Sequence, residues 1–255
     1  MIVPGVVRDK NSAPRRTIGQ GVDVFDIVPA GHYAEPLSAQ QFELVVASHT
    51  LLCEGNDVYL YILAGEGNIE SAGQKYSIKE GSAGMLLAGE QAQVSTTSTL
   101  SVVVIYVPGP ATPWAKRLAK EVDLSQRVVV TALGAANKQS ASSDREFEIL
   151  FDKNQASRGA TMFVGFIPTS GAPEHYHLYD EICMIVNGNG GLNTGDHEFQ
   201  ELKKGSAFHI APRYLHAIHN ANPEDVWILG VFRPEGSPSA AYYPDGRPAP
   251  NNLEE

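Results

Sequence analysis

The chain has 255 residues, of which 43% are hydrophobic and 19% are charged, and its formal net charge is −10. This composition predicts a folded protein of one or two domains and excludes intrinsic disorder. No apolar run approaches the roughly 20 residues that a membrane helix needs, and lysine and arginine are too scattered to form a basic patch for nucleic acid. The N-terminal residues do not resemble a secretory signal peptide. We therefore expect a cytoplasmic protein with no membrane or nucleic-acid partner.

The chain is punctuated by short runs rich in Val, Ile, Tyr and Phe, separated by glycine and proline, as in proteins built from β-strands and turns. These runs lie at residues 58–63, 101–107, 127–131, 146–151, 161–167, 182–186 and 226–232. One helix is predicted, over residues 112–123, because Pro113 lies near its start and apolar residues follow every four positions. Without an export signal, Cys53 and Cys183 are expected to be buried free thiols.

An internal repeat divides the chain into two similar halves. The glycine pair Gly65 and Gly67 recurs as Gly188 and Gly190 at an offset of 123 residues, and the Gly-Ser-Ala sequence at 81–83 recurs at 205–207. A proline at the end of an apolar run recurs at an offset of 126 residues. Three matches in register indicate duplication, with small insertions in turns. The sequence therefore predicts two β domains, residues 1–124 and 125–255.

A cluster of histidines in the second half carries the strongest chemical signal. Six of the eight histidines lie between residues 175 and 219. His175 and His177 are two residues apart, so both rings point to one face of a strand, and Glu181 follows four residues later. His216 comes from a distant strand. If they converge, three imidazoles and one carboxylate suit a divalent ion of Fe, Mn, Ni, Cu or Zn and leave coordination positions open.

These two stretches resemble the two motifs of the cupin superfamily. The first motif is matched by Gly171, His175, His177, Glu181 and Gly188, with Gly171 two residues closer to the first histidine than usual. The second is matched by Gly205, Pro212, His216 and Asn220, with one extra residue before the proline and Tyr214 where glycine is common. The resemblance implies two jelly-roll barrels, and the short helix predicted over residues 112–123 would join them. It also implies one divalent metal ion per chain, with Fe or Mn favoured, held by the second barrel.

The first half lacks the ligand set. By the repeat offsets, the positions of His175, His177, Glu181 and His216 fall on Leu52, Glu54, Val58 and Ala92. We therefore expect the first barrel to be structural and free of metal. Because jelly-roll barrels expose sheet edges, we also expect a homodimer.

Three more residues are candidates for catalytic roles beside the metal, together with Glu181. Tyr179 lies in a turn between the ligands and is a candidate substrate contact. Asn220 lies four residues after His216, so on a strand both side chains point to the same face. Asn220 either supports the metal site or hydrogen-bonds a barrel turn. The face that His209 occupies is not decided by alternation alone. The segment 240–247, with adjacent tyrosines, is expected to pack on a barrel or on a partner.

The sequence leaves three classes of function open. The sequence contains no Ser-His-Asp set, phosphate loop or dinucleotide motif, so the metal must carry the chemistry. The leading hypothesis is a dioxygenase-type oxidoreductase that binds a small polar, enolic or phenolic substrate and uses dioxygen. The alternatives are a redox-neutral isomerase, lyase or hydrolase, and a non-catalytic protein that binds a small ligand.

Overall fold

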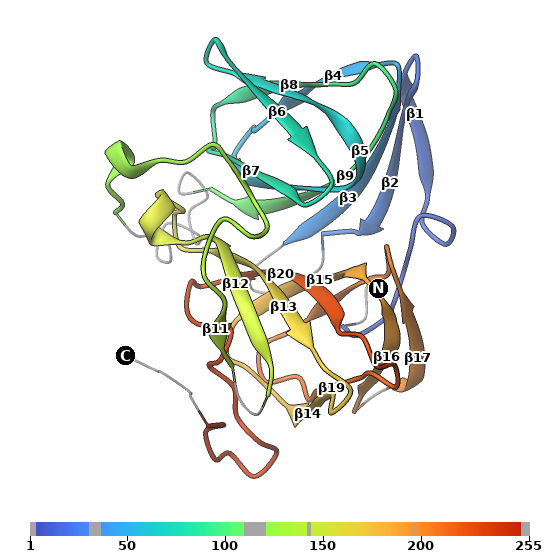
Figure 1. The fold of residues 1–255 in the computed structure, drawn as a ribbon, viewed down its shortest axis with the longest axis vertical. Coiled ribbons are helices and arrows are strands. Elements are labelled where there is room, and N and C mark those ends of the chain that lie inside the picture. Colours follow the sequence, from blue (N-terminus) through green and yellow to red (C-terminus); the bar gives the residue numbers. More distant parts are fainter. Residues whose placement is uncertain (1–3, 31–36, 110–120, 142–143, 196, 251–255) are drawn as a thin grey trace.

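The computed structural model describes residues 4–30, 37–109, 121–141, 144–195 and 197–250, which form strands joined by turns (Figure 1). The helical segments of these residues are two single 3-10 turns, η2 (Leu124–Gln126) and η3 (Lys153–Gln155). The prediction of an all-β fold is confirmed. The helix predicted over 112–123 falls mostly on residues outside the described ranges. No helix in the described segments is long and apolar enough to span a membrane.

The first half of the chain forms a barrel around its own apolar core. Its main sheet has the strand order β1 (Arg15–Gly19), β2 (Val22–Val28), β3 (Ser38–Val45), β9 (Thr99–Pro108), β5 (Asn56–Ser71), β7 (Ser82–Leu86) and β10 (Val130–Ala132). The other wall consists of β4 (Ser48–Leu52), β6 (Gln74–Lys79) and β8 (Gln91–Ser95). Strands β6 and β8 both pair with the long strand β5, and β4 pairs with β8. Strands β5 and β9 alternate their side chains between the barrel interior and its outer face.

The second half repeats this arrangement. Its larger sheet has the order β11 (Gln139–Ser140), β12 (Glu146–Phe151), β13 (Thr161–Ile167), β20 (Val226–Arg233), β15 (Asp180–Asn187) and β18 (Ala207–Ile210). Its smaller sheet has the order β14 (Ala172–His175), β19 (His216–His219), β16 (Asn189–Thr194) and β17 (His197–Lys203). The order β13-β20-β15-β18 corresponds to β3-β9-β5-β7 of the first half, as the sequence repeat predicts.

The repeat extends to backbone detail. A β-bulge interrupts the pairing of β5 with β9 between Ile62 and Ala64, and another interrupts β15 and β20 between Ile185 and Asn187, 123 residues later. The glycine that follows each bulge has a left-handed backbone, with φ of +84° at Gly65. A Cβ atom there would lie 2.1 Å from the carbonyl oxygen of Thr99. Glycine is therefore required where each strand bends from one sheet into the other.

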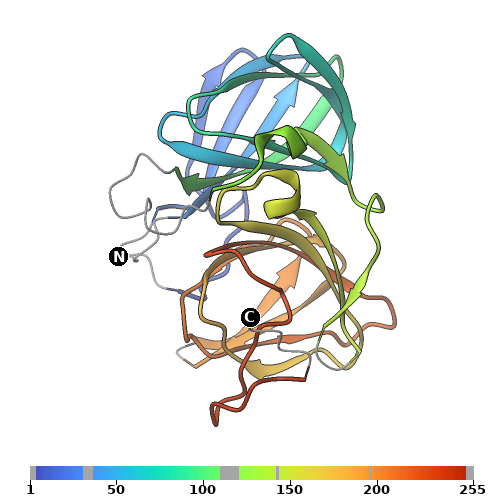
Figure 2. The ribbon, with the colours of Figure 1, turned by 90° about the vertical axis from the view of Figure 1, so that its left-hand side faces the viewer.

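The two barrels pack against each other through the outer faces of their larger sheets (Figures 1 and 2). One continuous apolar cluster contains side chains of both halves, including Tyr59, Met85 and Ile105 of the first and Met162, Met184 and Val231 of the second. All six are almost completely buried. Two segments also pair across the predicted domain boundary between residues 124 and 125. The amide of Arg8 donates to the carbonyl of Ala207 in β18 of the second barrel. Strand β10, which follows the boundary, pairs with β7 in the main sheet of the first barrel.

A buried ion pair also joins the barrels. The carboxylate of Asp57, in β5, contacts the guanidinium of Arg158 and accepts the amide of Ala88 at 2.7 Å. The Asp57 side chain is 2% exposed and that of Arg158 20%. We expect Asp57→Ala to lower the free energy of unfolding by about 2–3 kcal/mol, because it leaves Arg158 without its charge partner in a largely buried place. Urea denaturation measures this loss. Asp23→Ala, which removes an exposed ion pair with Arg15, is the control and should leave the midpoint nearly unchanged.

Candidate metal centre

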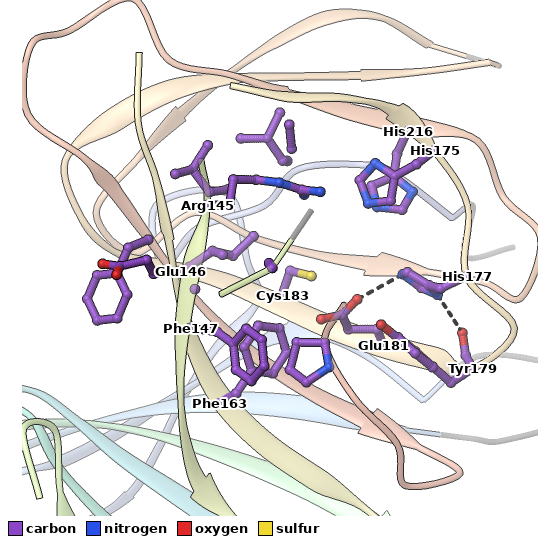
Figure 3. A pocket seen from close by; sticks show the side chains of 18 of the residues that line it. Arg145, Glu146, Phe147, Phe163, His175, His177, Tyr179, Glu181, Cys183 and His216 are labelled. Carbon is purple, nitrogen blue, oxygen red and sulfur yellow. Dashed lines mark hydrogen bonds and ion pairs between the residues drawn. The ribbon is translucent and has the colours of Figure 1, made fainter. Parts of the chain in front are cut away.

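Three strands and one connecting turn bring the predicted ligands together inside the second barrel (Figure 3). His175 ends β14 and lies opposite His216 in β19, with their ring centroids 4.3 Å apart. His177 follows β14, and its ring centroid is 5.1 Å from that of His216. Glu181 lies in β15, with its Oε2 atom 2.9 Å from Nε2 of His177. All four side chains are buried and line one cavity.

Backbone carbonyls fix the tautomer of all three histidines. The Nδ1 atoms of His175, His177 and His216 lie 2.7, 3.0 and 2.9 Å from the carbonyl oxygens of Pro173, Tyr179 and Tyr214 respectively. A carbonyl oxygen only accepts, so each Nδ1 carries the proton and donates. In the neutral form of each ring, the lone pair is therefore on Nε2. This is the arrangement by which proteins orient metal-binding histidines.

Within the candidate ligand set, one buried nitrogen has no hydrogen-bond partner among the described residues. It is Nε2 of His177, although Oε2 of Glu181 is only 2.9 Å away. With His177 in its neutral form, a lone pair that faces a carboxylate oxygen is costly in a buried site, and a cation bound to both atoms removes that cost. The four side chains are not in coordination geometry, since no group of three or more His, Cys, Asp or Glu in the described segments is arranged to hold a metal. Metal binding would require side-chain rotation.

Burial keeps two of the histidines neutral. Desolvation, with a smaller effect of the Arg145 charge, lowers the pKa of His175 to about 3. Desolvation also lowers the pKa of His216 well below its usual value, and the neighbouring imidazoles add to this effect. A neutral imidazole is the form that binds a metal ion. The site is therefore prepared for a cation at neutral pH without having to release protons from these two rings.

The cavity beside the four residues has a volume of about 70 Å³. A space of this size holds roughly five water molecules, so it suits a small substrate. Its walls are mainly apolar, formed by Phe147, Phe163, Phe166, Ile167, Phe208, Ile218 and Ile228. The guanidinium of Arg145, just before β12, extends across the cavity toward His175 and His216 (Figure 3). The cavity thus combines three imidazoles, one carboxylate and one cation in an apolar setting.

Comparison with known families gives a match in the same part of the chain. Residues 162–232 match a family model described as a cupin domain. The match begins in β13 and ends in β20, and it includes all four candidate ligands. No curated protein matches the chain.

Solved structures match over both halves. A cupin 2 conserved barrel domain protein from Leptotrichia buccalis has a TM-score of 0.61 and 15% identity, covering 91% of this chain and 98% of its own. An oxalate decarboxylase from Lactobacillus farciminis has a TM-score of 0.70 and 15% identity, covering 93% and 88%. AerE from Microcystis aeruginosa has a TM-score of 0.66 and 13% identity, covering 88% and 97%. The fold is that of the cupin barrels.

Within this cupin barrel, Tyr179 and Cys183 both line the cavity. The ring of Tyr179 stacks on that of His177, with centroids 4.1 Å apart, and on that of Phe232 at 3.9 Å. Tyr179 therefore orients His177 twice, through its ring and through its carbonyl oxygen. Both predicted thiols, Cys53 and Cys183, are buried and free. Burial raises the pKa of the Cys183 thiol well above its usual value, with a further contribution from Glu181.

Two residues expected beside the metal lie elsewhere, which corrects their predicted catalytic roles. His209 is on the opposite face of its sheet from Glu181, where its Nε2 lies 2.8 Å from Oδ1 of the buried Asp180. The amide nitrogen of Asn220 donates to the carbonyls of Ile167 and Glu224, both at 2.9 Å. Neither His209 nor Asn220 lines the cavity. Asn220 thus holds the end of the barrel turn, which was the alternative left open by the sequence.

The first barrel has apolar side chains at the corresponding positions. The pairing of Leu51 with Ala92 is equivalent to that of His175 with His216, which shows an offset of 124 in this region. Leu51, and not Leu52 as predicted, therefore corresponds to His175. By the same offset Cys53, and not Glu54, corresponds to His177. Leu52 points outward and is 54% exposed, because a shift of one residue reverses the face of a strand.

Sequence reasoning missed Arg145 and Gly230, because neither belongs to a motif. Gly230 in β20 pairs with Cys183 in β15. A Cβ atom at Gly230 would lie 2.2 Å from the ring of Phe163 and 2.5 Å from Oε1 of Glu181. The missing side chain therefore makes the space in which the Glu181 carboxylate lies. The only sequence signal was a glycine among large apolar residues of a predicted strand, which often marks a close approach.

We therefore expect Gly230→Ala to displace Glu181 and to weaken metal binding by about 10-fold or more. The measurement is a competition titration with a chelator, using Co(II) as the probe. Gly84→Ala is a matched control in a strand of the first barrel, where the nearest atoms to a Cβ would be Cδ1 of Leu60 at 3.1 Å and Cδ1 of Ile69 at 3.3 Å. Unchanged Co(II) affinity in Gly230→Ala would show that Glu181 is not a ligand.

Proposed function

We propose that this protein is a mononuclear metal-dependent enzyme that acts on a small anionic substrate in the second barrel. The observation that carries the proposal is the set of three imidazoles around one cavity, each with Nδ1 bound to a backbone carbonyl and Nε2 left for a cation. His175, His177, Glu181 and His216 would hold the ion. A structural neighbour, the Bacillus subtilis oxalate decarboxylase, has Mn(II) centres, although it is only 10% identical.

The charge of the site favours an anionic substrate. Glu181 contributes one negative charge, and a divalent ion together with Arg145 contributes three positive charges. A bound enolate, phenolate or carboxylate oxygen would reduce the excess positive charge of the site. The planar guanidinium of Arg145 presents paired donors that match a carboxylate, and it lies on the cavity wall facing His175 and His216. Arg145 would therefore bind and orient the substrate with an anionic oxygen toward the metal position.

The remaining walls favour a reaction with dioxygen. Rings of Phe147, Phe163 and Phe208 line the cavity, and this apolar setting strengthens the electrostatic interactions inside. They also offer an apolar space that suits a small uncharged molecule such as dioxygen. When bound, the metal ion would supply Lewis-acid polarisation and, for Fe or Mn, redox chemistry. The leading reaction class is thus the oxidation of a small enolic, phenolic or carboxylate substrate.

Oxygen uptake tests this proposal. The protein is loaded with Fe(II) or Mn(II) and supplied with small 2-oxo acids, dicarboxylic acids or catechols, with an anaerobic control. We expect oxygen consumption in proportion to the loss of one of these substrates, and no consumption by His175→Ala. Turnover of the same substrate without oxygen would reject the dioxygenase class.

A redox-neutral reaction is the second candidate, because two of the structural neighbours are oxalate decarboxylases and a decarboxylation is a lyase reaction. Glu146, the one carboxylate of the described lining that is not a candidate ligand, forms an ion pair with Lys138 at 3.3 Å. Its side chain lies on the opposite face of β12 from Phe147 and points away from the histidines (Figure 3). Anaerobic turnover of the same substrates, lost in His175→Ala, would support this class. A binding protein without catalysis would instead keep its ligand affinity in His175→Ala.

A further inference from the structure

Residues 238–249 fold back onto the chain segment that carries His175 and His177. The segment 238–249 forms a compact hairpin, in which the amide of Tyr243 donates to the carbonyl of Arg247 and that of Ala249 to Ala241, both at 2.8 Å. Gly246, with φ of +85°, makes the tight turn. Ala241 and Ala249 are buried. The segment is therefore a built element of the second barrel, and the sequence-based expectation that it packs on a barrel agrees with its position.

This hairpin contacts the ligand segment between His175 and His177. The amide of Tyr176 donates to the carbonyl of Tyr242 at 2.9 Å, and the amide of Tyr242 donates to the carbonyl of Tyr176 at 2.8 Å. The two tyrosine rings stack, with centroids 5.4 Å apart and planes 15° apart. Because strand side chains alternate, the Tyr176 ring points away from the cavity while both histidines point into it.

The contact completes an otherwise open edge. Among the strands that the structure describes, β14 is the outermost of its sheet and pairs only with β19. His175 lies opposite His216 on that side, and the carbonyl of His177 accepts the amide of Arg213 at 2.8 Å. Tyr176 lies between them with its own amide and carbonyl directed to the other side. Near the start of the hairpin, Pro238 lines the cavity itself.

We infer that the segment 238–249 is a strap that positions His175 and His177, with Tyr242 as the positioning residue, and that it determines how long the candidate centre retains its metal. This inference rests on the proposed metal site. Two backbone hydrogen bonds and one ring stack limit movement of the residue that links the two histidines. Loss of these contacts lets the rings move apart and raises the rate of metal release.

The test compares Tyr242→Pro, which removes the amide donated to Tyr176, with Tyr242→Phe, which keeps the ring stack and both backbone hydrogen bonds. In metal-free protein, hydrogen exchange of a peptide covering residues 172–180 should accelerate by about 10-fold or more in Tyr242→Pro only. In Co(II)-loaded protein, release to a chelator, followed by visible absorption, should accelerate by about 10-fold or more in the same variant. Unchanged exchange, or faster exchange with unchanged Co(II) release, overturns the inference.

Failure of the metal site and failure of the strap are distinguishable. If the wild-type chain binds no Co(II), the proposed function is rejected, and the claim that the strap retains a metal is rejected with it. The exchange measurement on metal-free protein then still shows whether Tyr242 holds the ligand segment. If Tyr242→Pro does not fold, Tyr242→Ala replaces it, since it removes the ring stack and keeps both backbone hydrogen bonds to Tyr176. Co(II) release about 3-fold faster is then expected, and an unchanged rate overturns the inference.

Discussion

His216→Ala is expected to abolish metal-dependent turnover and to weaken metal binding by at least about 100-fold. His216 comes from β19 and is the only candidate ligand outside residues 175–181, so its loss leaves the ion held from one side of the cavity. Changes to residues that merely support a ligand already cost about 10- to 100-fold in affinity, and loss of a ligand costs more. Competition between the protein and a chelator for Mn(II) or Co(II) measures the change.

His219→Ala is the matched control for this prediction. His219 lies on the same strand three residues later, is exposed, and contacts the ring of Phe199 on the outer face. Its removal should change neither metal affinity nor turnover. Equal affinities in His216→Ala and the wild type, with both proteins folded, would place the metal elsewhere.

Arg145→Ala is expected to lower kcat/KM for an anionic substrate by about 10- to 100-fold. A hydrogen bond between charged groups contributes roughly 1.5–3 kcal/mol, and each 1.4 kcal/mol corresponds to a factor of ten. Because Arg145 faces the cavity and is not a candidate ligand, metal content should not change. The loss should appear mainly in KM, since the guanidinium binds the substrate before the reaction.

Two comparisons separate substrate binding from a general effect on the fold. Arg145→Lys keeps the charge but loses the planar pair of donors, and it should recover only part of the activity. A neutral ester or amide of the same substrate should be turned over equally by Arg145→Ala and the wild type. An equal loss for the acid and for its neutral analogue would refute the assignment of Arg145 to the anionic group.

The sequence predicted those parts of the site that depend on spacing along one chain segment. His175 and His177 share a face because strand residues alternate, and Glu181, Cys183 and Ile185 share the interior face of β15 for the same reason. The offset between the two halves predicted two similar β domains, and the structure shows equivalent strands in them. These features are local, so a pattern of residue types is enough to reveal them.

Features that depend on contacts between distant segments could not be predicted in this way. Alternation fixes which residues share a face but not which face is the interior, so His209 was left undecided and lies opposite the cavity beside Asp180. One residue more in a turn changes the offset between the two halves from 123 to 124, so Leu51 and not Leu52 corresponds to His175. Arg145 reaches the site from outside both motifs, and Tyr242 contacts Tyr176 across 66 positions of the chain.

The central claim, that His175, His177, Glu181 and His216 together hold one metal ion, is tested most directly by a crystal structure recorded at the absorption edge of the bound metal. The account predicts one anomalous peak per chain in the second barrel, about 2.0–2.2 Å from one nitrogen of each histidine and from a carboxylate oxygen of Glu181. A peak in the first barrel or beside Asp180 and His209, or no peak after soaking with Mn(II) and Co(II), would contradict it.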